Sequence, residues 1–208
     1  DVYKRQLFIG DISFNDKRIT LEEFRSAKET GFLKDGTKLP FHQIPCLVVD
    51  GVPIAQTGAI ARFCGKLSGL YPSEDSISCA LIDQFIDFVT DLTNLVYIPS
   101  NSPLTEDEKI QHRRILAEGE LKRKLDMLED NISVNQTWIV GKEMTIADIA
   151  IWRGIGWLAS DLVAGIPQPY FVNYPKITKI FKNVDNHPKI CEWVRKTYPS
   201  NYNRGYIE

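Results

Sequence analysis

A proline stands directly before an apolar run in the segment IPCLVVDGVPIAQTGAIARF, and this arrangement restricts the fold more than any other feature of the chain. Pro45 has no backbone N–H, so the strand that follows must begin where no ladder hydrogen bond is needed from that position. Cys46–Val49 and Val52–Ala55 flank the dipeptide Asp50-Gly51, which is typical of a tight turn between antiparallel strands. The segment therefore predicts a hairpin followed by a helix over Thr57–Leu67.

The residues before the hairpin predict one more strand and one more helix. Ser13–Thr20 has the composition of a short strand, and Leu21–Gly31 places apolar residues at helical spacing before a glycine stop. Leu70–Ser73 is typical of a linker. The order strand, helix, strand, strand, helix indicates helices packed on a small mixed sheet.

Everything after the linker is predicted to be helical, because aliphatic and aromatic residues recur at helical spacing. The expected helices are Ile77–Tyr97, Glu106–Asn131, one that begins at Thr145, one around Tyr174–Val184, and Pro188–Lys196. The second carries charges on most of its turns, and its expected buried stripe is Ile110, Ile115, Leu121, Leu125 and Leu128. We therefore predict two domains, residues 1–72 with mixed α and β structure and residues 73–208 with helices alone.

The helix at Thr145 has the strongest start signal in the sequence. Thr145 can accept hydrogen bonds from free amides of the first turn while Asp148 reaches back, a capping box with Asp in the usual Glu position. Met144 and Ile149 occupy the two positions of a hydrophobic staple. This pattern fixes where the helix begins.

Composition excludes several classes of protein. The chain has 208 residues, 43% hydrophobic and 25% charged, with a formal net charge of −2, so it lacks the basic field that nucleic acid binding requires. No apolar run approaches the roughly 20 residues of a membrane span. The four cysteines are scattered and no histidine lies close enough to them for a zinc site, so we expect reduced thiols in a cytoplasmic protein without a metal.

Two motifs in the right order resemble the cytosolic glutathione transferases. IPCLVVDGVPIAQTGAIARF is similar to the family's proline, hairpin and Gln-Ser/Thr helix start, and WIVGKEMTIADI resembles its second-domain capping motif. The similarity runs from about Leu7 to about Thr197, and LEEFRSAKETGF looks most like the sigma and alpha-like members that use a catalytic tyrosine. The resemblance implies a thioredoxin-like, glutathione-binding first domain and an all-helical second domain.

The resemblance also implies how glutathione is held. The amide and hydroxyl of Thr57, with the Gln56 side chain beside them, are candidates for binding the γ-glutamyl carboxylate at a helix N-terminus, although a threonine here, taken alone, is more often only an N-cap. In the family the peptide bond before the proline is cis. The backbone of Ile44, before Pro45, is then expected to pair with the cysteinyl unit of the ligand.

The other end of the ligand needs a cation. Lys28 matches the position where similar members place a Lys or Arg for the glycyl carboxylate, and Lys38 is its rival. Gln43 replaces a residue that often contacts the same end. Phe24 stands where several members have a tryptophan, so the indole donor of those members is absent here.

The resemblance further implies a homodimer and a second substrate. Asp91 matches an aspartate that reaches the ammonium of glutathione in the neighbouring subunit, while the simpler alternative is an exposed acidic helix face. A small hydrophobic electrophile is expected to bind between the end of the first domain, the region of Thr93 and Ile98, and the helix after Asp148. The expected reaction is conjugation of the glutathione thiolate, or isomerisation of a lipid-derived compound.

The catalytic tyrosine of such members ends the first strand, and this sequence is expected to begin after that strand. Tyr3 lies too late to replace it. Our hypothesis is an open reading frame truncated at its N-terminus, with DVYKRQ as a cloning or sequencing junction and with little activity in this chain alone. Cys46 is expected to be a small core residue, and His42, His112 and His187 to be surface or structural residues.

Non-enzymatic proteins of the same ancestry are the alternative. Lens crystallins and the gamma subunit of a translation elongation factor have this fold, and fold does not fix function. A thioredoxin or glutaredoxin is disfavoured because the sequence has no C-x-x-C pair, and a chloride-channel-like member would need a membrane-competent helix.

Overall fold

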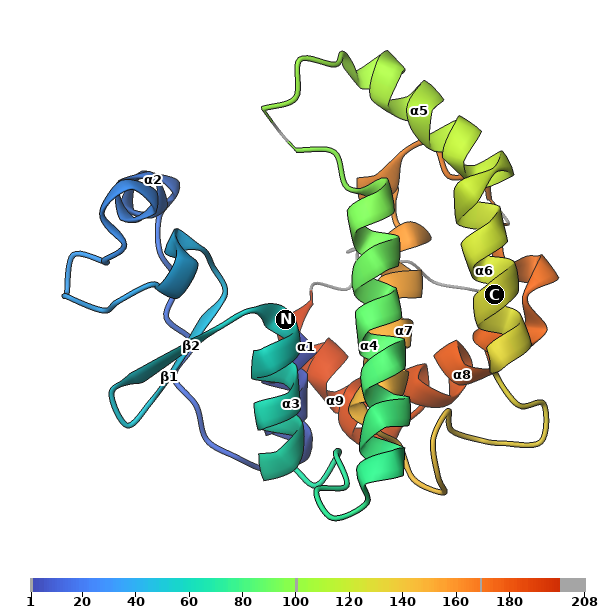
Figure 1. The fold of residues 1–208 in the computed structure, drawn as a ribbon, viewed down its shortest axis with the longest axis horizontal. Coiled ribbons are helices and arrows are strands. Elements are labelled where there is room, and N and C mark those ends of the chain that lie inside the picture. The colour runs from blue at the N-terminus through green and yellow to red at the C-terminus, as the bar shows by residue number, and fades with distance from the viewer. Residues whose placement is uncertain (1, 100, 169, 199–208) are drawn as a thin grey trace. The chain divides into compact units, whose positions relative to one another are not determined.

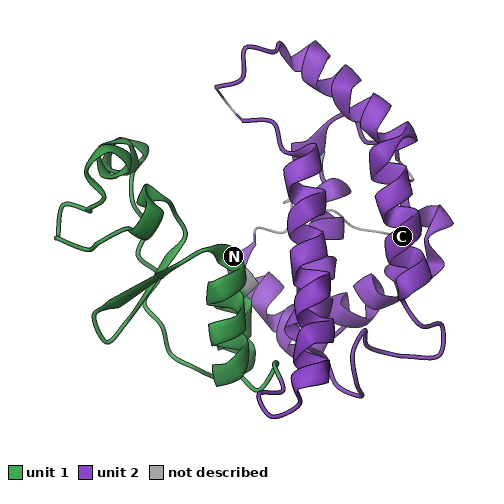
Figure 2. Ribbon diagram, in the orientation of Figure 1, with its two compact units in different colours: residues 1–71 green, residues 72–208 purple. Residues whose placement is uncertain are grey.

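The chain forms two compact units, residues 1–71 and 72–208 (Figures 1 and 2), in a computed structural model that describes residues 2–99, 101–168 and 170–198. The elements of the first unit are α1 (Val2–Ile9), α2 (Leu21–Thr30), the 3-10 turn η1 (Pro40–His42), β1 (Cys46–Val49), β2 (Val52–Ala55) and α3 (Thr57–Leu67). The elements of the second are α4 (Ser76–Val96), α5 (Glu106–Glu118), α6 (Glu120–Asn131), α7 (Ile146–Leu158), η2 (Asp161–Val163), η3 (Phe171–Asn173), α8 (Pro175–Asp185) and α9 (Pro188–Thr197).

The hairpin and the helix after it confirm the prediction from the sequence. β1 pairs with β2 in antiparallel register, from Cys46 opposite Ala55 to Val49 opposite Val52. Asp50 and Gly51 both have positive φ, 49° and 80°, which is the conformation that a two-residue turn of this hand requires. The second strand of the hairpin thus ends two residues before α3 begins.

The strand predicted over Ser13–Thr20 is wrong. These residues form no strand and most of them are exposed; Ile19 alone among them packs against a core cluster. Thr20 instead caps α2, because its hydroxyl accepts a hydrogen bond from the Glu23 amide at 3.1 Å. A strand persists only beside a partner, and within the described residues the sheet contains β1 and β2 alone.

Two small apolar clusters hold the first unit together. Ile60 and Cys64 of α3 pack with Leu7 of α1, and Leu47 and Ile54 of the hairpin cover them. Burial raises the pKa of the Cys64 thiol to about 11, so this cysteine stays a neutral apolar side chain. This cluster therefore holds the open end of the hairpin, away from the Asp50-Gly51 turn, against α1 and α3.

The second cluster lies between α2 and the start of β1. It consists of Ala27, Leu33 and Leu39, with Ile19 and Cys46 packed against it. Burial raises the pKa of the Cys46 thiol, as expected of a small core residue rather than a nucleophile.

The second unit is built around α7, the most buried helix of the described chain. Its contacts with α4 and α8 are extensive, and Figure 1 shows the three helices together in the second unit. A Cβ on Gly154 would stand 2.9 Å from Cγ1 of Val89, so the glycine permits close approach of α7 to α4. On the other side the Trp152 indole donates to Oδ1 of Asp185 at 3.0 Å, which joins α7 to α8. Among the described residues, no helix has both the length and the apolar character needed to cross a bilayer.

The start of α7 confirms the capping prediction. The Asp148 carboxylate is fully buried and accepts from the amides of Ile139 and Thr145, each at 2.8 Å, and from the Thr145 hydroxyl at 2.9 Å. Met144 and Ile149, the predicted staple pair, are both buried. Asp148 therefore ties the preceding loop to the first turn of the central helix.

The single helix predicted over Glu106–Asn131 is in fact two helices. Gly119 separates α5 from α6 with φ −116° and ψ −108°, values that no helix contains. The break changes which face is covered: Leu121, Leu125 and Leu128 are buried as predicted, whereas Ile115, predicted to be buried, is 62% exposed. A single helical period continued across Gly119 therefore cannot predict the buried faces of both α5 and α6.

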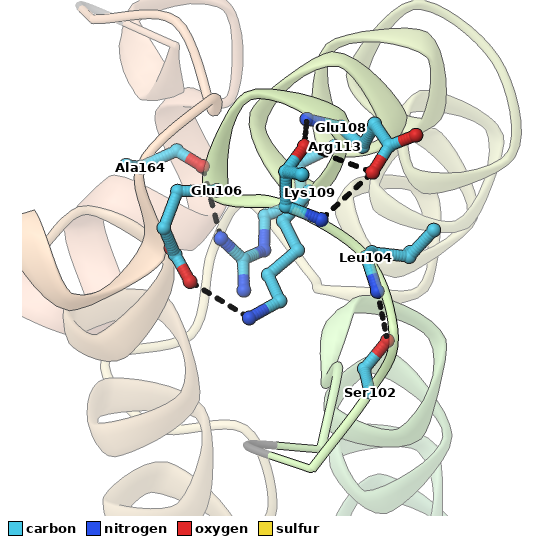
Figure 3. A network of polar contacts seen from close by, with 8 residues as sticks. Ser102, Leu104, Glu106, Glu108, Lys109, Arg113 and Ala164 are labelled. Carbon is cyan, nitrogen blue, oxygen red and sulfur yellow. Dashed lines mark hydrogen bonds and ion pairs between the residues drawn. The ribbon is translucent and has the colours of Figure 1, made fainter.

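Polar contacts at the start of α5 join it to the loop after α7 (Figure 3). Thr105 and Glu108 form a second capping box, in which the Glu108 carboxylate accepts from the Thr105 amide at 2.7 Å. One turn further along, the Arg113 guanidinium donates to the carbonyl oxygen of Ala164 at 3.1 Å, and Gly165 lies against the backbone of Ile110. These contacts fix the outer helices of the second unit.

Candidate functional site

The segment before β1 has the backbone form that the resemblance implies. The Ile44–Pro45 peptide bond is cis, and Gln43 is extended with φ −131° and ψ 156°. Gln43 and Ile44 are both exposed, and the Ile44 side chain is 47% exposed. The strand ladder begins only at Cys46, so the backbone of Ile44 lies outside it.

The start of α3 is an exposed helix N-terminus. Gln56 is its N-cap, with φ 70° and ψ 121°, and its side chain makes no capping hydrogen bond to this helix. Thr57 is the first helical residue and does not cap the helix, so the simpler interpretation of Thr57 as an N-cap is wrong. The free amides, the positive end of the helix dipole and the exposure of Gln56 and Thr57 make this terminus able to bind an anion.

The two candidate cations both belong to the first unit. Lys28 lies in the last turn of α2, is exposed, and holds its ammonium 5.4 Å from the centroid of the half-buried Phe24 ring. This cation–π contact restricts the lysine side chain without neutralising its charge. Lys38 is also exposed, and its backbone pairs with Phe32 in an isolated bridge.

Sequence reasoning missed the contact between His42 and the end of α2. Nδ1 of His42 lies 2.8 Å from the carbonyl oxygen of Lys28. These residues are 14 positions apart, and no local periodicity or motif in the sequence signals a contact that only the fold creates.

Asp91 lies on α4 in the second unit, and its side chain is 65% exposed. Its carboxylate is 3.7 Å from the ammonium of Lys124, which in turn lies 5.4 Å from the Phe88 ring centroid. Because the Asp91 carboxylate is exposed and the two charges are 3.7 Å apart, this ion pair contributes little to stability, and Asp91 can exchange Lys124 for another cation.

Thr93 and Ile98, the candidates for the electrophile site, and Tyr3 provide neither an activated nucleophile nor a metal ligand cluster. Thr93 is half-buried and donates its hydroxyl to the carbonyl of Val89 at 2.8 Å, and Ile98 is half-buried. In the part of the chain that the structure describes, no group of three or more His, Cys, Asp or Glu side chains could hold a metal ion. Desolvation, the largest effect, raises the pKa of Tyr3, which is the opposite of what an activated phenol requires.

Comparisons with known proteins identify the family. The family model described as "Glutathione S-transferase, C-terminal domain" matches residues 88–197. Glutathione S-transferase 2 of Caenorhabditis elegans is 30% identical over 174 residues, which cover 82% of this chain and 88% of that protein. The hematopoietic prostaglandin D synthase of Gallus gallus is 26% identical over 193 residues, covering 92% of this chain and 88% of that protein.

A solved structure shows the same fold. The rat hematopoietic prostaglandin D synthase complexed with a quinoline superimposes with a TM-score of 0.77 at 22% identity, covering 97% of this chain and 92% of that chain. The small sheet with its helices and the helical unit therefore correspond to the thioredoxin-like and helical domains of one fold. By the family model and by sequence identity, this chain belongs to the glutathione S-transferase family.

Proposed function

We propose that this chain binds glutathione, and that the complete protein joins the glutathione thiol to small hydrophobic electrophiles or isomerises a lipid-derived one. The observation that carries the proposal is the exposed N-terminus of α3, where the N-cap side chain of Gln56 makes no capping hydrogen bond and which follows the cis-proline segment after one hairpin. The first arrangement suits a carboxylate and the second suits a peptide backbone, and glutathione has both. The names of the similar proteins support both reactions.

Three groups of the tripeptide have candidate partners in residues 1–72, which we propose as the glutathione-binding domain, with residues 73–208 as the helical domain. The γ-glutamyl carboxylate takes the Thr57 amide and the Gln56 side chain. The cysteinyl unit pairs with the backbone of Ile44 beside Pro45. The glycyl carboxylate takes Lys28, and we assign Phe24 and Gln43 to the same end of the ligand from the positions that they match in the family.

The chemistry depends on the thiolate of glutathione, because the thiolate and not the thiol attacks an electrophile. The thiolate sulfur forms a bond to a carbon atom of the electrophile. The electron pair of the bond that breaks leaves with the departing group, or, in an addition, moves onto the acceptor, which is then protonated. We propose that a tyrosine hydroxyl stabilises the thiolate by donating a hydrogen bond to it. The four free cysteines suit a reducing compartment, which supports a cytoplasmic location.

The proposal is tested by titrating glutathione into the full chain and by measuring its conjugation to a general electrophile. We expect binding at millimolar glutathione or below, and turnover by the complete protein. Absence of binding both by this chain and by the complete protein would exclude the enzyme. Binding without turnover by the complete protein would instead indicate a non-catalytic protein of this family.

Replacing Gln56 with alanine is expected to weaken glutathione binding about fivefold, because one hydrogen bond to the γ-glutamyl carboxylate is lost while the helix amides remain. Since the Gln56 side chain makes no capping hydrogen bond, the midpoint of thermal unfolding should stay within about 2 °C of wild type. Calorimetric titration and thermal unfolding give the two values. Unchanged affinity would show that the carboxylate binds elsewhere.

We propose that the functional unit is a homodimer, with Asp91 serving the ammonium of glutathione in the neighbouring subunit. Asp91→Asn should then weaken glutathione binding by less than about fivefold, because the Asp91 carboxylate is exposed and its attraction to the ammonium of glutathione is screened by salt. The effect should disappear when the protein is diluted to monomers, as monitored by sedimentation velocity. Lys124→Gln removes the intrachain partner of Asp91 and should not weaken binding; a loss as large as that of Asp91→Asn would contradict the proposed role.

A further inference from the structure

His42 occupies a strained position at the entrance to the cis-proline segment. It ends η1 and is followed directly by Gln43, Ile44 and Pro45. Its φ is +54°, and that of Phe41 before it is +59°, so two consecutive residues with side chains adopt the left-handed region. Such residues persist only where the surrounding structure holds them, and they concentrate at functional sites. Other turns of this chain have glycine at positive φ, so the presence of histidine at position 42 calls for a structural explanation.

The imidazole supplies that reason by binding the last turn of α2. Its Nδ1 lies 2.8 Å from the carbonyl oxygen of Lys28. A carbonyl can only accept, so Nδ1 carries the hydrogen and donates it, which holds both for the Nδ1–H tautomer and for the protonated ring. The last carbonyls of a helix have no partner within the helix, and His42 satisfies one of them.

Gly31 makes room for the ring. A Cβ on Gly31 would lie 2.7 Å from Nε2 of His42, closer than real Cβ contacts allow. Gly31 also has φ +79° as the residue after α2, a conformation that glycine adopts without strain. The backbone adds a second link, because the Leu39 amide donates to the Gly31 carbonyl at 2.7 Å. The end of α2 and the turn η1 are therefore joined at two points.

We propose that His42 is a positioning residue that places Lys28 for the glycyl carboxylate of glutathione, and the inference rests on the function proposed above. His42 touches no part of the ligand. It fixes the α2 turn that carries the Lys28 ammonium relative to Gln43 and Ile44, and the Phe24 ring, 5.4 Å from that ammonium, restricts the lysine side chain. Lys28 and the cis-proline segment thereby act as one rigid element, so the glycyl end and the cysteinyl unit are recognised together.

The test compares three variants of His42 by their affinity for two ligands, glutathione and its glycinamide analogue, which lacks the glycyl carboxylate. His42→Gly removes the donor and suits the backbone, and His42→Asp places an acceptor against the Lys28 carbonyl. His42→Asn keeps an N–H donor at the position of Nδ1 and tolerates positive φ. Exposed His112 on α5 gives the control variant His112→Asn.

We expect His42→Gly and His42→Asp to bind glutathione about fivefold more weakly, with unchanged affinity for the glycinamide analogue, because only the lysine–carboxylate contact is displaced. His42→Asn should restore most of the preference for glutathione. A purely structural role would weaken both ligands equally, and that result overturns the inference, as does an unchanged preference in all three variants. If wild type binds neither ligand, the proposed function itself fails; if wild type binds and the variants are unaltered, only the role of His42 is lost.

A second perturbation approaches the same contact from Gly31. Gly31→Ala should displace the imidazole and reduce the preference for glutathione, and adding His42→Gly should produce little further loss, because the steric conflict is then absent. Independent, additive losses from the two substitutions would contradict the coupling.

Discussion

The Asp148→Ala variant should unfold with a free energy about 3–5 kcal/mol below that of wild type, or fail to fold at 37 °C. The carboxylate is fully buried and accepts three hydrogen bonds, so its removal leaves the amides of Ile139 and Thr145 without a partner in the protein interior. The loss falls at the start of α7, which packs against α4 and α8. Urea unfolding monitored by tryptophan fluorescence measures the change.

The second capping box supplies a matched control. Glu108 at the start of α5 accepts from the Thr105 amide and hydroxyl at 2.7 and 2.8 Å, but this box is exposed. Water replaces the lost partner there, so Glu108→Ala should cost only about 0.5–1 kcal/mol. Equal losses at the two sites would show that burial is not what makes Asp148 important.

The pH dependence of the Asp148 contribution has a definite sign. Desolvation raises the pKa of Asp148 above its ordinary value, with the hydrogen bonds from Ile139 and Thr145 acting against it. The folded state therefore binds this proton more tightly than the unfolded state does. The contribution of Asp148 is complete below the unfolded pKa and declines as pH rises through the folded pKa. The difference in unfolding free energy between wild type and Asp148→Asn should accordingly widen as pH falls from neutrality.

Features fixed by a few adjacent residues could be predicted from the sequence. The Asp50-Gly51 turn, the stop of α2 at Gly31 and the capping box at Thr145 each depend on local backbone chemistry, and each is confirmed. The same holds for the helical character of the second unit, because amphipathic spacing is also a local signal.

Features that depend on distant partners could not be predicted. Ser13–Thr20 has strand-like composition, yet a strand requires a neighbour in the sheet, and composition does not reveal one. Ile115 fits the helical period of a single helix, but the break at Gly119 gives α5 a different buried face. In the candidate site, the helix start at Gln56-Thr57 was visible in the sequence, whereas the His42 contact with Lys28 exists only through the fold.

Lys28→Gln is expected to weaken glutathione binding about tenfold, at the lower end of what a charged hydrogen bond contributes, because the ammonium is exposed and screened by salt. The glutamine keeps much of the length and packing of the side chain over Phe24 and removes only the charge. Calorimetric titration at low and high salt measures the effect: wild-type affinity should fall as salt increases, and the affinity of the variant should change less.

Lys38→Gln is the matched control, because Lys38 is the rival cation in the same unit. It should leave the affinity within about twofold of wild type, since an exposed charge without a ligand contact contributes little. Removing the glycyl carboxylate from the ligand completes the comparison: Lys28→Gln and wild type should bind the glycinamide analogue equally, because the lysine then has no partner to lose. A large loss with Lys38→Gln and none with Lys28→Gln would assign the carboxylate to Lys38. It would also remove the basis for a positioning role of His42, whose hydrogen bond holds the α2 turn and not the segment that carries Lys38.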